Sequence, residues 1–180
     1  MTEQHIRFDD GAAYERAMGG WSQLVGAIFL DWLAPPVGLR WLDVGCGSGV
    51  FSELLVERCA PTAVQGIDPS EEQLAFARTR SAARVAQFRQ GDAMALPFPD
   101  DTFDVAVMAL VISFVPDPAQ AVAEMVRVAR PGGTVAAYSW DMLRGGFPWD
   151  AMHVEMRALG ATPRRPPGGV VGEAACRGRC

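Results

Sequence analysis

The spacing of apolar residues divides the chain into helices that alternate with short strands. Large apolar side chains recur three and four positions apart over residues 21–32, which predicts a helix with one apolar face, beginning at Tyr14 and ending before Pro35. Residues 39–44 are mostly apolar and typical of a buried strand, and residues 50–59 return to helical spacing. This change of period predicts a strand that runs directly into a helix.

The same alternation continues through the middle of the chain. Further strands are predicted at residues 63–67, 85–89, 103–112 and 134–139, and further helices at residues 70–84, 118–129 and 149–159. Residues 103–112 are almost all apolar, which is typical of a strand buried on both faces of a parallel sheet. Pro131-Gly132-Gly133 is expected to separate the helix at residues 118–129 from the fifth strand. Five strands alternating with helices predict a doubly wound, mostly parallel α/β sheet.

Composition indicates one globular domain, because 49% of the residues are hydrophobic and 21% are charged. Residues 1–13 are expected to be a flexible leader, residues 14–162 the folded domain, and the Pro-, Gly- and Arg-rich residues 163–180 a disordered tail. The first residues show neither a basic segment nor an apolar signal core, and no apolar run is long enough to span a bilayer. These features predict a cytoplasmic protein without a membrane span.

Charge and residue usage exclude several kinds of chemistry. The net charge of −5 argues against a nucleic-acid partner, which needs a basic surface. The chain contains no lysine, so neither a Walker-type phosphate lysine nor a Schiff base is available. Its four cysteines form no C-x-x-C pair and are expected to be free thiols, with no metal site.

Three glycines at alternate positions, Gly45, Gly47 and Gly49, join the first strand to the next helix with no spacer. A turn of this kind directs free backbone N–H groups and a helix N-terminus at a ligand. Glycine is needed either for a positive φ or because a Cβ would block the approach of the ligand. The same turn also occurs without a ligand, so both interpretations stay open on this motif alone.

Acidic residues stand at the ends of three successive predicted strands: Asp43, Asp68 and Asp92. Asp68 follows the glycines by about twenty residues, where a carboxylate can accept both hydroxyls of a ribose; alternatively it caps the helix that begins near Ser70. Asp92 could accept an adenine amino hydrogen or could be a turn residue after Gly91. Asp43 could orient the glycine turn or meet a ligand ammonium. Because strand ends meet at one edge of a parallel sheet, the three acids together predict a nucleoside site.

Five segments in order resemble the motifs of the class I S-adenosylmethionine-dependent methyltransferases, in particular the small-molecule branch similar to the ubiquinone/menaquinone-type enzymes. The segments are Trp41–Gly49, Gly66–Ser70, Gly91–Ala93, Phe103–Asp104 with its apolar strand, and Arg130–Gly133. The resemblance covers roughly Tyr14 to Ser139. It implies a Rossmann-like fold, S-adenosyl-L-methionine as cofactor, and methyl transfer to a small-molecule acceptor.

The resemblance also implies roles for individual residues. The implied cofactor contacts are the backbone of Gly45, Cys46, Gly47 and Gly49 at the methionine end, Asp43 beside the turn, Asp68 and Pro69 at the ribose, Asp92 and Ala93 at the adenine, Ala109 and Leu110 at the floor, and Tyr14 in a lid. A general base is optional, because the sulfonium methyl is already activated. His153 is a candidate base, although a surface or packing role is the commoner explanation for such a histidine.

A departure from the family pattern keeps alternatives open. The fold usually adds two further strands as an antiparallel hairpin, and the forty or so residues after Ser139 contain no convincing pair. We therefore expect a truncated chain whose fifth strand is an exposed edge that can pair with another copy. The chain is then either an active methyltransferase or a cofactor-binding remnant without turnover. A nicotinamide-binding fold is a remote alternative, because it prefers G-x-G-x-x-G to the G-x-G-x-G found here.

Overall fold

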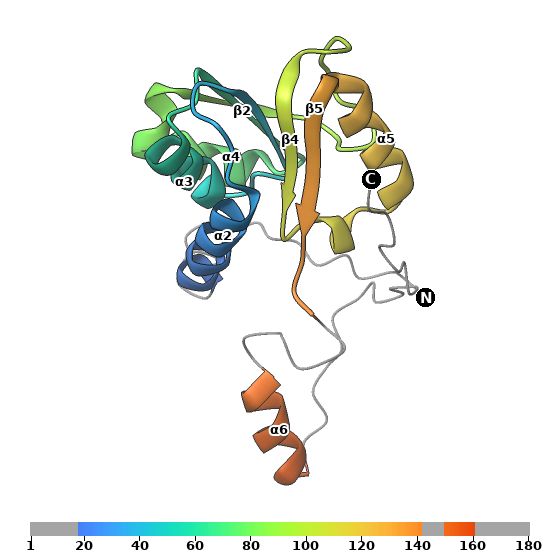
Figure 1. Cartoon of the computed structure of the whole chain (residues 1–180). Helices are drawn as coiled ribbons and strands as arrows, with labels where there is room; N and C mark the ends of the chain where they lie inside the picture. Colours follow the sequence, from blue (N-terminus) through green and yellow to red (C-terminus); the bar gives the residue numbers. More distant parts are fainter. Residues whose placement is uncertain (1–17, 142–149, 161–180) are drawn as a thin grey trace.

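The structure, a computed structural model, describes residues 18–141 and 150–160 (Figure 1). Its centre is a parallel sheet of five strands in the order β3-β2-β1-β4-β5. The strands are β1 (Arg40–Val44), β2 (Ala63–Asp68), β3 (Ala86–Gln90), β4 (Phe103–Ala109) and β5 (Ala129–Tyr138). The order reverses direction at β1, so a topological switch point lies between β1 and β4. The predicted doubly wound parallel sheet is confirmed.

Helices cover both faces of the sheet (Figure 1). The helical elements are α2 (Gly20–Leu33), α3 (Val50–Cys59), α4 (Glu71–Ala77), η2 (Ser81–Arg84), η3 (Ile112–Phe114), α5 (Pro118–Val128) and α6 (Asp150–Ala158). On one face, α2, α3 and α4 bury Phe29, Leu55 and Leu74 against Trp41 of β1. On the other face, α5 buries Met125 against the sheet. The sheet is thus the middle layer of three, with an apolar core on each side.

Two predicted elements end earlier than expected. The fourth strand was expected to reach residue 112 but ends at Ala109, because Leu110 takes a φ of +64° and η3 follows. The helix expected over residues 70–84 is instead α4 followed by the separate 3₁₀ helix η2. Ser70 is the N-cap of α4, since its hydroxyl accepts from the Gln73 N–H at 3.3 Å. The apolar run continues beyond the end of β4, and the helical spacing continues beyond the end of α4. The sequence pattern alone therefore predicts both elements as too long.

The fifth strand begins earlier than expected. Pro131-Gly132-Gly133 was expected to precede the strand, but β5 runs through it from Ala129 with a shift of register against β4. A Cβ on Gly133 would lie 2.8 Å from the Arg130 carbonyl oxygen and 2.9 Å from that of Asp104, so only glycine fits this bulge. The prediction of a break was wrong, because the three residues form a bulge inside the strand.

Helix α2 does not have the single apolar face that its spacing predicts. Phe29 and Leu30 are buried in the core. Four other large apolar side chains of α2 are exposed to solvent over 48 to 75% of their surface: Trp21, Leu24, Ile28 and Trp32. The helix therefore carries two apolar faces, and only one of them packs on the sheet.

The remaining expectations concern cysteines, metals and membranes. Cys46 and Cys59 are buried free thiols, whereas Cys176, Cys180, the expected leader 1–13 and the expected tail 163–180 lie outside the described residues. Within residues 18–141 and 150–160, no group of three His, Cys, Asp or Glu side chains could hold a metal ion. The helices of this part of the chain are too short or too polar to cross a bilayer.

Candidate functional site

The glycine turn is fixed to the end of β2. The N–H groups of Gly45 and Cys46 both donate to the carbonyl oxygen of Ile67, at 2.7 and 3.0 Å. All three glycines have positive φ, 75°, 51° and 80° for Gly45, Gly47 and Gly49, and Gly49 is the N-cap of α3. Each of the three glycines therefore has a backbone conformation that favours glycine over other residues.

The three glycines differ in what surrounds them. A Cβ on Gly45 would lie 2.7 Å from Val111 Cγ2, and one on Gly49 would lie 2.9 Å from Ala77 Cβ. These two glycines are needed for packing of the fold itself. A Cβ on Gly47 would meet no atom nearer than Gln73 Oε1, at 4.0 Å. Gly47 is therefore the member of the turn that a ligand can approach closely.

The Asp68 carboxylate lies directly against the glycine turn. Its Oδ2 accepts from the Gly47 N–H and its Oδ1 from the Ser70 N–H, each at 2.9 Å. The side chain thus binds the backbone of the N-cap residue of α4 and also joins the glycine turn to the end of β2. Burial raises the pKa of Asp68, and the two backbone hydrogen bonds oppose that rise. A carboxylate has about four acceptor positions, so two such bonds leave capacity for hydroxyl donors of a ligand.

Asp43 is fully buried at the end of β1. Its Oδ2 accepts from the Ser52 hydroxyl of α3 at 2.6 Å. Its Oδ1 is buried and accepts no hydrogen bond from the part of the chain that the structure describes. Burial raises the pKa of Asp43 to about 7, the Ser52 bond opposes the rise, and the charge of Asp68 adds to it.

Cys46 contributes its backbone rather than its thiol. Burial raises the pKa of the Cys46 thiol well above its ordinary value, and the neighbouring carboxyls Asp43 and Asp68 raise it further. The thiol therefore stays protonated and unreactive at neutral pH.

The end of β3 lies beside the end of β2. The Gly91 N–H donates to the Asp68 carbonyl oxygen at 3.1 Å, and the Gln90 side-chain amide donates to the Pro69 carbonyl oxygen at 2.8 Å. Asp92 is a turn residue, because its Oδ1 accepts from the Met94 N–H at 2.8 Å. These contacts bring Asp92 to the same edge of the sheet as Asp68.

The end of β4 closes the other side of the turn. The Leu110 N–H donates to the Tyr138 carbonyl oxygen at 2.9 Å, which holds Leu110 in its left-handed conformation. The chain then brings Val111 against Gly45. Ala109 and Leu110 therefore lie at the strand end next to the glycine turn, on the side opposite β2.

Two further residues support the turn and carry no recognisable sequence motif. Ser52 binds Asp43, as described. Arg80 follows α4, and its guanidinium donates to the Ser48 carbonyl oxygen and to Glu53 Oε2, both at 2.6 Å. The side chains of Arg80 and Glu53 are only 11% and 18% exposed. Arg80 thus ties the glycine turn and α3 to the segment after α4.

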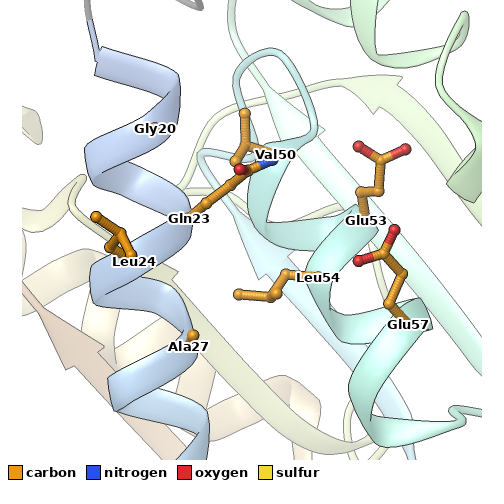
Figure 2. A pocket seen from close by; sticks show the side chains of 8 residues that line it. All are labelled: Gly20, Gln23, Leu24, Ala27, Val50, Glu53, Leu54 and Glu57. Carbon is orange, nitrogen blue, oxygen red and sulfur yellow. The ribbon is translucent and has the colours of Figure 1, made fainter.

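A cavity of about 270 Å³ lies between α2 and α3 (Figure 2). It is lined by Gly20, Gln23, Leu24, Ala27, Val50, Glu53, Leu54 and Glu57. None of the predicted site residues that the structure describes lines it. Among these lining residues, Val50 is the one that adjoins the glycine turn, because it follows Gly49.

Two of the predicted site residues are not placed in the site. Tyr14, the expected lid residue, lies outside the described residues. His153 lies in α6, where the structure describes the backbone and not that side chain. The described members of the predicted set are Asp43, Gly45, Cys46, Gly47, Gly49, Asp68, Pro69, Asp92, Ala93, Ala109 and Leu110, and all stand at or next to the carboxyl ends of β1 to β4.

Known proteins share this sequence pattern and fold. The phosphatidylethanolamine N-methyltransferase of Cereibacter sphaeroides is 45% identical over 102 residues, 54% of this chain and 49% of that protein. The ubiquinone/menaquinone biosynthesis C-methyltransferase of Roseobacter denitrificans is 39% identical over 118 residues, 63% of this chain and 47% of that protein. A chain of the Haloferax volcanii complex with the Trm112 methyltransferase activator has the same fold, with a TM-score of 0.67 and 24% identity over 82% of this chain and 70% of that one.

These matches cover part of each relative: the chain spans 38% of the first relatives and about half of the two named above. A family model described as a methyltransferase domain matches residues 42–137, more than half of the chain. The match begins in β1 and ends in β5, so it contains the glycine turn, Asp68 and Asp92. It decides against the dinucleotide-binding alternative and confirms the resemblance read from the motifs: the chain belongs to the methyltransferase domain family.

Proposed function

We propose that this chain binds S-adenosyl-L-methionine over the glycine turn and the ends of β2 and β3, and that the protein transfers the methyl group to a small-molecule acceptor. One observation carries the proposal. The Gly47 N–H and the Asp68 carboxylate, 21 residues apart, are joined by a 2.9 Å hydrogen bond at the switch-point edge of the sheet. The turn and the acid are therefore adjacent at this edge, which supports one nucleoside site formed by both.

The residues present fit such a cofactor. Gly47 leaves room for close approach of the methionine end, while Gly45 and Gly49 fix the shape of the turn. Asp68 keeps acceptor capacity for ribose hydroxyls, with Pro69 beside it. Asp92 and Ala93 are assigned to the adenine end, and Ala109 and Leu110 to the floor beside the turn. Two buried carboxyls near the turn, Asp43 and Asp68, suit a ligand that carries positive charge.

When bound, the cofactor supplies a sulfonium methyl group that is already activated for transfer. The contribution of the protein is to hold the acceptor in line with that group and to exclude water. The buried strand end at Leu110 supplies an apolar wall. His153 is proposed as a base only for acceptors that must lose a proton before attack.

A small-molecule acceptor is supported by the names of the two relatives, one for N-methylation of a phospholipid and one for C-methylation in quinone biosynthesis. An acceptor screen should therefore contain an amine headgroup and a quinol, each assayed for transfer of a tritiated methyl group. Transfer to one of them supports an active enzyme. Cofactor binding without transfer to any acceptor supports the alternative of a binding domain without turnover.

Cofactor binding is tested by isothermal titration with S-adenosylmethionine and S-adenosylhomocysteine. Replacing Asp68 by Ala should weaken both ligands roughly 10- to 100-fold, as expected for loss of charge-assisted hydrogen bonds. Asp31→Ala is the matched control, because Asp31 is a surface carboxyl paired with Arg58 and 68% exposed. The proposal fails if folded wild-type protein binds neither ligand, or if both variants bind as the wild type does.

A further inference from the structure

The loop between β3 and β4 carries Asp92 and Ala93, the two residues proposed for the adenine end of the cofactor. Residues 91–102, all of which the structure describes, contain no helix and no strand of the sheet. The loop therefore depends on other contacts to keep one shape. Polar groups that are already in place bind a ligand more tightly than groups that binding must first order.

Helix α5 holds this loop with two charged side chains. The Glu124 carboxylate accepts from the Leu96 N–H at 2.8 Å, and the Arg127 guanidinium donates to the Leu96 carbonyl oxygen at 2.9 Å. The same guanidinium donates to the Phe98 carbonyl oxygen at 2.8 Å. Both backbone polar groups of Leu96 are thus satisfied by side chains of one helix, as a neighbouring strand would satisfy them.

The two side chains also bind each other. Arg127 Nε and Nη2 donate to the two oxygens of Glu124, each at 2.7 Å, which is the bidentate arrangement of an arginine and a carboxylate. The hydrogen bond from Arg127 lowers the pKa of Glu124, so the carboxylate is ionised at neutral pH. Arg127 donates in addition to the Asp100 carboxylate at 2.8 Å. Because a guanidinium is planar and rigid, the pair fixes several points of the loop relative to α5.

A continuous series of hydrogen bonds connects Leu96 to Asp92. The Asp92 carboxylate accepts from the Met94 N–H at 2.8 Å, and the Asp92 carbonyl oxygen accepts from the Ala95 N–H at 3.1 Å. Leu96, which follows directly, is buried. The position of the Asp92 side chain is therefore coupled to the residue that α5 holds.

The Glu124–Arg127 pair stands away from the strand ends that form the site. Helix α5 ends at Val128, and β5 begins at the next residue, at the edge of the parallel sheet opposite the glycine turn. Glu124 and Arg127 lie in the last two turns of α5, next to Met125 and Val128, which are buried against the sheet. Any effect of the pair on a ligand must therefore pass through the loop.

We propose that Glu124 and Arg127 are positioning residues for the cofactor: they hold the loop after β3 so that Asp92 stays within reach of the adenine amino group. This inference rests on the proposed function, in which Asp92 and Ala93 meet the adenine. The pair acts through the backbone of Leu96 and the turn at Asp92, without contact with the ligand. Its loss should weaken recognition of the base more than binding of the rest of the cofactor.

The test uses two ligands that differ only in the base. S-adenosylhomocysteine carries an amino group that can donate to a carboxylate, whereas S-inosylhomocysteine carries a carbonyl oxygen at that position. In isothermal titration, the wild type should bind S-adenosylhomocysteine more tightly by roughly 10- to 100-fold, as expected for one hydrogen bond to a charged group. Arg127→Met should reduce this preference by about three- to tenfold, and the Kd for S-inosylhomocysteine should change by less than about twofold.

Two further variants make the result specific to the pair. Glu124→Gln keeps the shape of the side chain and an acceptor for the Leu96 N–H, so it should reduce the preference in the same direction by a smaller factor. It decides the question if Arg127→Met does not fold. Arg40→Met is the matched control, because it also removes an arginine bound to a partly buried carboxylate, that of Asp104, at the opposite edge of the sheet. It should lower the melting temperature and leave the preference unchanged.

The outcomes separate the two proposals. Absence of binding of either ligand to folded wild-type protein overturns the proposed function and this inference together. Equal affinity of the wild type for the two ligands overturns the contact between Asp92 and the adenine, and this inference with it, while cofactor binding stands. A wild-type preference in folded Arg127→Met and Glu124→Gln, or an equal loss of preference in Arg40→Met, overturns the inference alone, because the pair then only stabilises the fold.

Discussion

Gly45→Ala is the substitution for which the structure gives the clearest cost. Gly45 has a φ of +75°, and its Cβ position lies 2.7 Å from Val111 Cγ2 and 3.0 Å from Val111 Cβ. The left-handed conformation costs an alanine about 1–2 kcal/mol, and overlap in a packed region adds about 1–3 kcal/mol. Gly45→Ala should therefore lower the free energy of unfolding by about 2–5 kcal/mol.

Two further variants separate the two contributions. Gly132 has the same φ of +75° but no atom within 4 Å of its Cβ position, so Gly132→Ala should show only the conformational cost. Val111→Ala removes the γ-carbons that a methyl side chain at position 45 would meet, at a cost of about 1–2 kcal/mol for two partly buried methyl groups. The double variant Gly45→Ala/Val111→Ala should then be more stable than the sum of the single effects by about 1–2 kcal/mol.

The assay is urea unfolding followed by far-ultraviolet circular dichroism, with equal m-values required before the free energies are compared. The reasoning is refuted if Gly45→Ala costs no more than Gly132→Ala. It is also refuted if the double variant is additive to within about 0.5 kcal/mol, because Val111 would then not be what excludes a side chain at position 45.

Two other predictions concern charged residues around the sheet. Arg80→Met should lower the free energy of unfolding, measured with urea, by about 2–4 kcal/mol, because the partly buried Glu53 carboxylate loses its arginine partner. Arg58→Met, which removes an exposed ion pair, is the control. An equally small effect of both variants would contradict the role given to Arg80. Hydrogen bonds from Arg40 and Arg130 lower the pKa of Asp104 to about 2, so the stability it contributes is present above pH 4 and lost as pH falls toward 2. Asp104→Asn should therefore reduce the melting temperature at pH 7 and flatten its decline between pH 4 and 2, and equal acid sensitivity of the two proteins would contradict this.

The sequence predicts the part of the site that depends on local backbone chemistry. The first strand, the glycine turn and α3 follow from an apolar run, three glycines and a change of period, and Asp68 follows from its position at the next strand end. These signals are local. Positive φ in the turn requires glycine, and the position of the acid in the site requires only that it stands at the end of a strand. The N-cap of α4 is Ser70, whereas Asp68 accepts from the Ser70 N–H with one oxygen and from the Gly47 N–H with the other, and its contact with a ribose stays a prediction.

The parts that the sequence did not predict depend on contacts between distant segments. The spacing in α2 marks apolar residues, but only packing on the sheet decides that Phe29 is buried while Trp32 is 75% exposed. Pro131-Gly132-Gly133 has the composition of a break, and the register of β5 against β4 makes it a bulge. Arg80 has no motif, because its partners Ser48 and Glu53 lie about 30 residues away along the chain. Residues of this kind can be identified only when the order of the strands in the sheet is known, because that order brings their partners together.

The central claim is that the glycine turn and the end of β2 form one cofactor site. The most direct test is titration of ¹⁵N-labelled protein with S-adenosylhomocysteine, followed by the backbone amide signals of Gly47, Asp68 and Asp92. We predict that these signals shift together and saturate with one Kd, while those of the α2–α3 cavity residues Leu24 and Glu57 change little. Saturable binding that moves the cavity signals and leaves Gly47 and Asp68 unchanged would contradict the account.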